Sequence, residues 1–86
     1  MQQIKKHNLK ILAKRIKELR NKNSTSLNKF VFSKGGITTA TWSRVENALV
    51  DVKFTTLVQI SSMLGMPLHE LVFDLKLDYT LEEDLK

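Results

Sequence analysis

The chain has 86 residues, a net charge of +5, 42% hydrophobic residues and no cysteine. This length predicts one domain with a modest core, and this hydrophobic content is typical of a folded chain. The lack of cysteine excludes disulfides and thiolate chemistry and fits a reducing compartment. No apolar run approaches the ~20 residues needed to cross a bilayer. The first residues also lack the apolar stretch of a signal peptide.

The charge is divided unevenly along the chain. Residues 1–53 contain twelve Lys or Arg and three acidic residues, a net charge of +9, whereas residues 54–86 contain two Lys and six acidic residues, a net charge of −4. A basic portion joined to an acidic end predicts a polyanionic partner, such as nucleic acid, for one face only. Two solvated faces of opposite charge would give the same distribution, so charge alone leaves both interpretations open.

The first predicted helix follows Asn8, which can cap it, and the residues before Asn8 can add a turn or stay loose. Its apolar residues recur every three or four positions and form one face: Leu9, Leu12, Ile16 and Leu19. The other faces are basic, and residues 21–23 form a polar end. A basic amphipathic helix can also lie on a membrane surface. This is the weaker interpretation, because later amphipathic segments can cover the apolar face.

A second helix is predicted at about 27–34 and a third at about 39–48. A cluster of capping residues at 24–26 precedes the second helix, and Gly35 and Gly36 end it, because glycine adopts left-handed dihedrals freely. We expect Ile37 to be a buried anchor and Thr38 to cap the third helix. Trp42 and Val45 form the apolar stripe of that helix. Its remaining side chains face outward: Thr39, Ala40, Ser43 and Arg44.

A fourth helix is predicted from Phe54, Leu57, Ile60 and Leu64, which again recur at helical spacing. Gly65 is its stop signal. Pro67 suits the first turn of a fifth helix, which is predicted from residue 68 to about 73.

The C-terminal residues follow a different pattern. Apolar and polar residues alternate over 74–81, which is a strand signal. No second strand is predicted in this chain, so the segment is either an ordered extension on the core or pairs with the same segment of another molecule. The acidic residues 82–84 are expected to be solvated. The predicted organisation is therefore a domain at 1–73 and an acidic and apolar extension at 74–86.

Two short helices joined by a glycine turn form a helix-turn-helix, whose second helix can enter the ~12 Å wide major groove of DNA. The chain offers little for other chemistry. His7 and His69 lie far apart without cysteine or acidic residues at ligand spacing, which argues against a metal site. No nucleophile–base grouping or phosphate-binding glycine loop is present in the sequence. We therefore expect no enzymatic activity, no cofactor and no metal.

Several stretches resemble the Cro and xenobiotic-response-element (phage-repressor-like) helix-turn-helix family in the right order and at the right separations. The matching residues are LAKRIKELR at 12–20, GIT at 36–38, SRVEN at 43–47, LVQI at 57–60 and LGMPLHEL at 64–71. The resemblance covers about residues 9–73. It implies an all-α, compact five-helix domain of the lambda-repressor-like type, with a C-terminal extension that is extended or a single β-strand.

The resemblance also implies roles for individual residues. It places four side chains toward the bases: Thr39, Ala40, Ser43 and Arg44. It assigns backbone contacts or capping to Asn28, Thr38, Thr41 and Lys53. It implies a structural ion pair between Arg20 and Glu46 that holds the first helix against the third, and it makes Trp42 and Val45 core residues.

The chain departs from the family at several positions. The family's Gln at the start of the second helix falls on Leu27 when counted from Arg20 and on Asn28 when counted from Gly36, so one residue is inserted, most naturally in the glycine turn. Other positions differ in residue type: Val31 or Phe32 replaces a small residue, Trp42 an aliphatic residue, and Ala48 a glycine. The tilt of the third helix is therefore expected to differ from that of relatives.

Two side chains allow alternative roles. Arg44 can bond a guanine in a bidentate manner or bond only a phosphate. Trp42 can lie in the core or form an exposed stacking platform for single strands.

The resulting hypothesis is a sequence-specific double-stranded DNA-binding transcriptional regulator, a repressor that binds an inverted-repeat operator as a homodimer. We expect it to be cytoplasmic, of the prokaryotic type, and associated with the nucleoid when bound to DNA. The candidate dimer contacts are Leu71, Val72, Phe73, Leu75, Leu77, Tyr79 and Leu81. The alternative is an antitoxin or other protein-interaction module whose segment 74–86 binds a partner protein.

Overall fold

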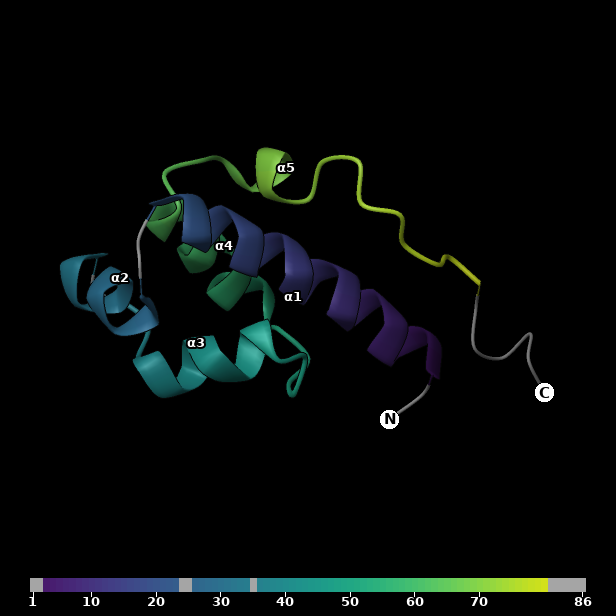
Figure 1. Cartoon of the computed structure of the whole chain (residues 1–86). Helices are drawn as coiled ribbons and strands as arrows, with labels where there is room; N and C mark the ends of the chain where they lie inside the picture. The colour runs from purple at the N-terminus through teal and green to yellow at the C-terminus, as the bar shows by residue number, and fades with distance from the viewer. Residues whose placement is uncertain (1–2, 24–25, 35, 81–86) are drawn as a thin grey trace.

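The structure, a computed structural model, describes residues 3–23, 26–34 and 36–80 (Figure 1). Over these residues the chain is all-α, as predicted, with five helices and no strand. The helices are α1 (Gln3–Asn23), α2 (Leu27–Lys34), α3 (Thr39–Glu46), α4 (Phe54–Met63) and α5 (Leu68–Leu71). The long α1 lies across the shorter helices and extends past the end of α3 (Figure 1).

The core takes one large side chain from each helix. The largest fully buried side chains are Ile16, Phe30, Trp42, Ile60 and Leu71, from α1 to α5 in turn. The rings of Phe30 and Trp42 are 4.9 Å apart at an interplanar angle of 60°. Ile37 and Val45 are also buried, as predicted. Because Trp42 has no exposed surface, the core interpretation is confirmed and the stacking-platform alternative is wrong.

The helix α1 begins at Gln3, so Asn8 does not cap it. The residues before Asn8 extend the helix, which was one of the two alternatives expected for them. The residues before Asn8 include no proline or glycine, and nothing in them breaks a helix. Arg20 and Lys22 in the last turn of α1 interact favourably with the negative end of the helix dipole.

The helices α3 and α4 end in the same hydrogen-bonded motif. In α3, the N–H of Ala48 donates to the carbonyl of Val45 over 3.1 Å, and the N–H of Leu49 donates to that of Arg44 over 2.9 Å. In α4, Gly65 and the residue after it make the equivalent bonds to Ser62 and Ser61. This is the Schellman motif, which places one residue in the left-handed region.

In these two motifs the left-handed residues are Ala48, with φ of 56°, and Gly65, with φ of 74°. The turn ends α3 at Glu46, two residues before the predicted end. Ala48 thus adopts this dihedral where the family has glycine. Its methyl group is buried in a small cluster with Leu9 and Ala13, which compensates for part of the strain.

Gly65→Ala should destabilise the protein by about 1 kcal/mol, because an L-residue is strained at this φ. A methyl group at this position would have no neighbour within 4 Å, so the difference in stability between the variant and the parent chain would not include a packing contribution. Urea unfolding followed by Trp42 fluorescence measures the change. Ser62→Ala, at an exposed position in α4, is the control and should shift stability by less than about 0.5 kcal/mol. Equal stability of Gly65→Ala and the parent chain would contradict the backbone explanation.

The helix α5 is shorter than predicted and leads into an extended tail, residues 75–80. Pro67 is the N-cap of α5 rather than part of its first turn, and the helix ends at Leu71 instead of at about Phe73. The guanidinium of Arg15 holds this end of α5 by donating to the carbonyls of Leu71 over 3.1 Å and Glu70 over 3.0 Å.

The strand predicted at 74–81 does not form in the described part of this segment: Asp74 is in a left-handed turn with φ of 57°, and residues 75–80 have no regular structure. The alternation matches burial over three residues only: Leu75 and Leu77 are half-buried and Lys76 is exposed, whereas Tyr79, at the next apolar position, is exposed. The segment is therefore an ordered extension on the core, which was one of the two expected alternatives, up to residue 80.

Asn8 fastens this tail to α1. Its Nδ2 donates to the carbonyl of Asp78 over 2.9 Å, and its Oδ1 accepts from the N–H of Asp78 over 2.7 Å. One side-chain amide thus supplies the two bonds that a neighbouring strand would supply. The N–H of Thr80 donates to the Asp78 carboxylate over 2.9 Å, and this bond lowers the pKa of Asp78 below its ordinary value, assisted by the nearby His7.

Asn8→Ala should release the tail and cost about 1–2 kcal/mol of stability, since both hydrogen bonds are partly buried. The direct measurement is hydrogen exchange at the Asp78 amide, which should become faster while amides in α3 and α4 change only with global stability. Asn21→Ala, at an exposed position on the same helix, is the matched control. Unchanged exchange at Asp78 would show that the amide is not protected by Asn8.

Candidate nucleic-acid interface

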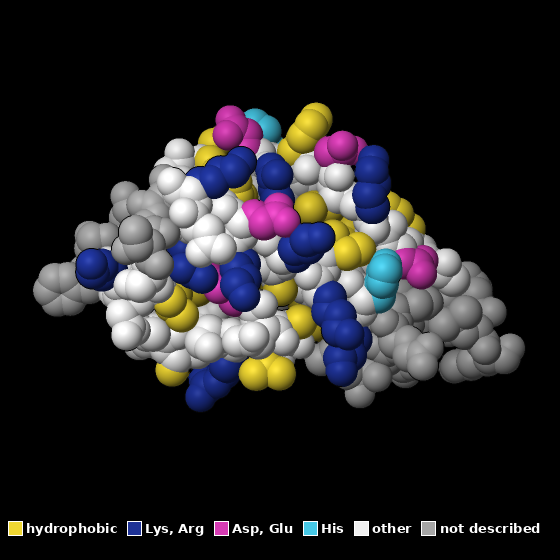
Figure 2. Space-filling model, viewed as in Figure 1, with side chains coloured by type: hydrophobic (Ala, Val, Ile, Leu, Met, Phe, Trp, Pro, Cys, Tyr) yellow, Lys and Arg dark blue, Asp and Glu magenta, His cyan; other side chains and the backbone are white. Residues whose placement is uncertain are grey.

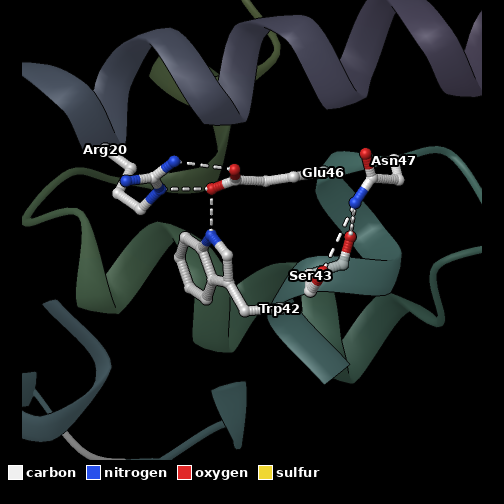
Figure 3. A network of polar contacts seen from close by, with 5 residues as sticks. All are labelled: Arg20, Trp42, Ser43, Glu46 and Asn47. Carbon is white, nitrogen blue, oxygen red and sulfur yellow. Dashed lines mark hydrogen bonds and ion pairs between the residues drawn. The ribbon is translucent and has the colours of Figure 1, made fainter. Parts of the chain in front are cut away.

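A buried polar network fixes α3 against α1 (Figure 3). Arg20 Nε donates to Glu46 Oε2 over 2.5 Å, and its terminal nitrogen donates to Oε1 over 2.9 Å. The two side chains are only 8% and 6% exposed. The ion pair expected from the resemblance is therefore present. The hydrogen bonds to Glu46 raise the pKa of Arg20 above its ordinary value, and they outweigh the lowering by burial.

Trp42 adds a third hydrogen bond to this network. Its indole N–H donates to the same Glu46 Oε2 that accepts from Arg20 Nε (Figure 3). Trp42 was predicted to lie in the core, but this hydrogen bond was not predicted. The signal was available, because residues 42 and 46 are one helical turn apart and lie on the same face of α3. Trp42 thus supplies a hydrogen-bond donor to Glu46, which an aliphatic residue at this position could not do.

The N-terminus of α3 is formed by a capped turn. Gly36 has φ of 93°, a dihedral that favours glycine. Thr38 caps the helix: its Oγ1 accepts from the N–H of Thr41 over 3.2 Å, and its hydroxyl bonds the hydroxyl of Thr41 over 3.1 Å. Capping by Thr38 is confirmed. The predicted insertion site includes Gly35, which lies outside the described residues.

The outward side of α3 carries the predicted base-facing residues with different exposure. Ala40 and Arg44 are exposed, whereas Thr39 and Ser43 are only half-exposed. Asn47 is exposed and lies one turn beyond Ser43. Its Nδ2 donates to the Ser43 carbonyl over 2.8 Å and to the Ser43 hydroxyl over 3.3 Å (Figure 3). Asn47 was not predicted to be a site residue, although the spacing of residues 40, 43 and 47 places it on the same side of α3.

Two of the predicted backbone-contact residues lie together beside α3. Thr41 and Lys53 line one hollow of about 240 Å³ between α3 and the start of α4. Lys53 is exposed and is the N-cap of α4. Its side chain makes no cap bond and the first turn of α4 contains no acidic residue, but Asp51 lines the same hollow. The N–H groups at the start of a helix favour anions.

Another predicted backbone contact, Asn28, belongs to a different helix. It is exposed on α2, whereas Leu27 is half-buried and packs against the core. Of the two positions that the sequence left open for the family's Gln, only Asn28 is therefore accessible to a ligand. Ser26 caps α2 by accepting from the N–H of Lys29 over 3.2 Å.

The predicted dimer contacts are partly wrong. Leu71 is fully buried, so it cannot contact a partner. Val72, Phe73 and Tyr79 are exposed, while Leu75 and Leu77 line a groove of about 280 Å³ with apolar residues of α1 and α4. Leu81 lies outside the described residues.

Three other large apolar side chains are exposed. Phe54, the first of the apolar residues from which the fourth helix was predicted, is 70% exposed. Leu49 and Val58 are exposed as well. Phe54 is at helical spacing from Leu57, but six residues separate it from the buried Ile60, which places the two about 120° apart around α4.

No helix in the described part of the chain is long and apolar enough to span a membrane. Comparisons with protein-family models, curated proteins and solved structures find no match for this chain. The functional interpretation therefore depends on the geometry of α3 and its neighbours and on the sequence motifs.

Proposed function

We propose that this protein is a sequence-specific double-stranded DNA-binding transcriptional regulator, a repressor of the Cro and xenobiotic-response-element type. The proposal is based on how the side chains of α3 are divided between the core and the surface. Trp42 and Val45 are buried and Glu46 is bonded to Arg20, so the rotation of the helix is fixed. This rotation leaves a row of small and polar side chains outward, ending in an exposed arginine.

The side chains of this row suit the edges of bases in the major groove. Arg44 can donate two hydrogen bonds to a guanine, the hydroxyls of Thr39 and Ser43 can bond several bases, and the methyl group of Ala40 can contact a thymine methyl. Small residues at the start of α3 allow the helix backbone to approach the bases closely. Ser43 is half-exposed and its hydroxyl accepts a hydrogen bond from Asn47. We therefore expect Ser43 and Asn47 to contact a base together.

The elements on either side of α3 offer phosphate contacts. Lys53 and the uncapped start of α4 follow α3 in the chain, with Thr41 in the same hollow. Asn28 is exposed on α2, which precedes α3. Contacts of this kind fix the position of a recognition helix in the groove without reading sequence.

A single recognition helix reads only ~3–4 base pairs, which is too little to select a site in a genome. We therefore propose a homodimer on an inverted repeat. The exposed apolar residues provide a surface for the second copy: Leu49, Phe54, Val58, Val72, Phe73 and Tyr79. A cytoplasmic regulator bound to the nucleoid fits this proposal.

The alternative is an antitoxin or other interaction module that binds a partner through residues 74–86. The contacts of residues 74–80 support this alternative less well than the regulator proposal. Asn8 holds the backbone of Asp78, and Leu75 and Leu77 already face α1 and α4. A partner would have to displace these contacts before it could bind the segment.

Selection of bound duplexes from a random pool, at one fixed salt concentration and with the full chain, tests the proposal. We expect enrichment of an inverted repeat with half-sites about one helical turn, ~34 Å, apart. Sedimentation of the complex should give two protein chains per duplex. Failure to enrich any sequence would refute the regulator proposal. Enrichment of a single half-site bound by one chain would refute the homodimer.

A further inference from the structure

The helix α1 carries a row of lysines that the contacts proposed above do not use. Lys6, Lys10, Lys14 and Lys17 recur every three or four residues, so they share one side of the helix, and all four are exposed. At 1.5 Å per residue the row extends over about 16 Å. We call these four residues the lysine face. Figure 2 shows Lys and Arg side chains along the course of α1.

The lysine face adjoins the C-terminal end of α3. Lys10, Lys14 and Lys17 line a hollow of about 310 Å³ together with Glu46, Asn47 and Ala48. Asn47, the C-cap of α3, lies just beyond the outward row and bonds to Ser43 within that row. The lysines therefore lie beside the surface that faces the bases in the proposed complex.

These lysines are not needed to complete the end of α3. The carbonyls of Ser43, Arg44 and Val45 already accept backbone N–H groups in the last turn and the Schellman motif. In the described part of the chain, none of the ammonium groups of Lys10, Lys14 and Lys17 is in an ion pair. Their charges are thus available to an external anion.

We infer that the lysine face is a second phosphate-binding surface, which contacts the DNA backbone beside the half-site that α3 reads. This inference rests on the proposed function and adds a contact to it. Four cations spread over one helix suit a chain of phosphates better than a single anion. A membrane surface is a poorer partner, because the apolar side of α1, with Ile16 and Leu19, is buried in the core.

The test compares the parent chain with the triple variant K10Q/K14Q/K17Q in titrations of the selected duplex over a range of salt. Glutamine has nearly the helix propensity of lysine, so α1 should be retained, which circular dichroism checks. Each lost phosphate contact should reduce the slope of log K against log salt by about 0.9, so we expect a reduction of about 2–3. The triple variant should lose affinity for a random duplex by the same factor as for the selected duplex. It should still select the same sequence as the parent chain.

Single variants give a matched control. K14Q and K76Q each remove one positive charge from an exposed position. Lys76 lines a hollow with Lys14, but it lies in the tail, where Asp74 pairs with it over 3.0 Å and offsets its charge. K14Q should reduce the slope by about one, and K76Q should leave it unchanged. The pair of variants also keeps the test valid if the triple variant does not fold.

The outcomes separate this inference from the proposed function. The triple variant could select the same sequence as the parent chain and show the same salt slope. This result would overturn the inference about the lysine face and leave the regulator proposal standing. A parent chain that selects no sequence would refute the regulator proposal itself. A third outcome is that the parent chain binds anionic phospholipid vesicles and the triple variant does not, while the salt slope of DNA binding is the same for both. This result would assign the lysine face to a membrane and overturn the inference.

Discussion

Glu46→Ala should destabilise the protein by about 3–5 kcal/mol, because it leaves the buried charge of Arg20 without a partner. The guanidinium is 8% exposed and makes both of its bonds in this network to the lost carboxylate. The same change removes the acceptor of the Trp42 indole N–H. A domain of this size has a total stability of about 5–15 kcal/mol, so the variant should be close to unfolding at ordinary temperature.

Urea unfolding followed by Trp42 fluorescence measures this effect. Glu18→Ala is the matched control, since Glu18 is an exposed acid on α1, and it should change stability by less than about 0.5 kcal/mol. An equally small effect of Glu46→Ala would show that the pair does not hold α1 against α3 in solution.

A double variant separates the stranded charge from the loss of packing. Arg20→Met combined with Glu46→Gln removes both charges, while the side-chain carbonyl of the glutamine can still accept from Trp42. We expect this double variant to recover most of the stability lost in Glu46→Ala, because replacing both partners of a buried pair is often nearly neutral. A double variant that is as unstable as Glu46→Ala would assign the effect to packing rather than to charge.

The core could be predicted from the sequence because local spacing determines it. Helical periodicity placed Ile16, Trp42 and Ile60 on buried faces, and the family motifs supplied the Arg20–Glu46 pair that links two helices. Glycine and threonine at fixed positions predicted the turn and the cap of α3. Each of these features depends on residues close together in the chain or on a known pattern.

Contacts between distant segments could not be predicted in this way. The bonds from Asn8 to Asp78 join residues at opposite ends of the chain, and only the packed structure shows that the tail lies on α1. Phe54 fits the period of α4, but whether another element covers it depends on how the helices are arranged. Leu71 was assigned to the dimer contact because it is apolar and near the acidic end, yet it completes the core.

Arg44→Ala should reduce discrimination between operator variants by about 1–3 kcal/mol at one base pair, or ~5–150-fold. Arg44 is the exposed cation of the outward row of α3, and a guanidinium matches the two acceptors of guanine. The network of Glu46 and Trp42 holds the helix in the rotation that directs it outward. Because Arg44 is exposed, the stability of the variant should change by less than about 0.5 kcal/mol.

Lys53→Ala is the comparison that distinguishes base reading from phosphate contact at Arg44. Lys53 is exposed at the start of α4, where only a backbone contact is proposed. This variant should weaken all duplexes by the same factor and reduce the salt slope by about one. The measurements are affinity for the selected duplex over a range of salt, and affinity for each single-base-pair variant at one salt concentration. If Arg44→Ala also weakens every duplex equally, Arg44 binds only phosphate, and the sequence must be read by Thr39, Ala40 and Ser43.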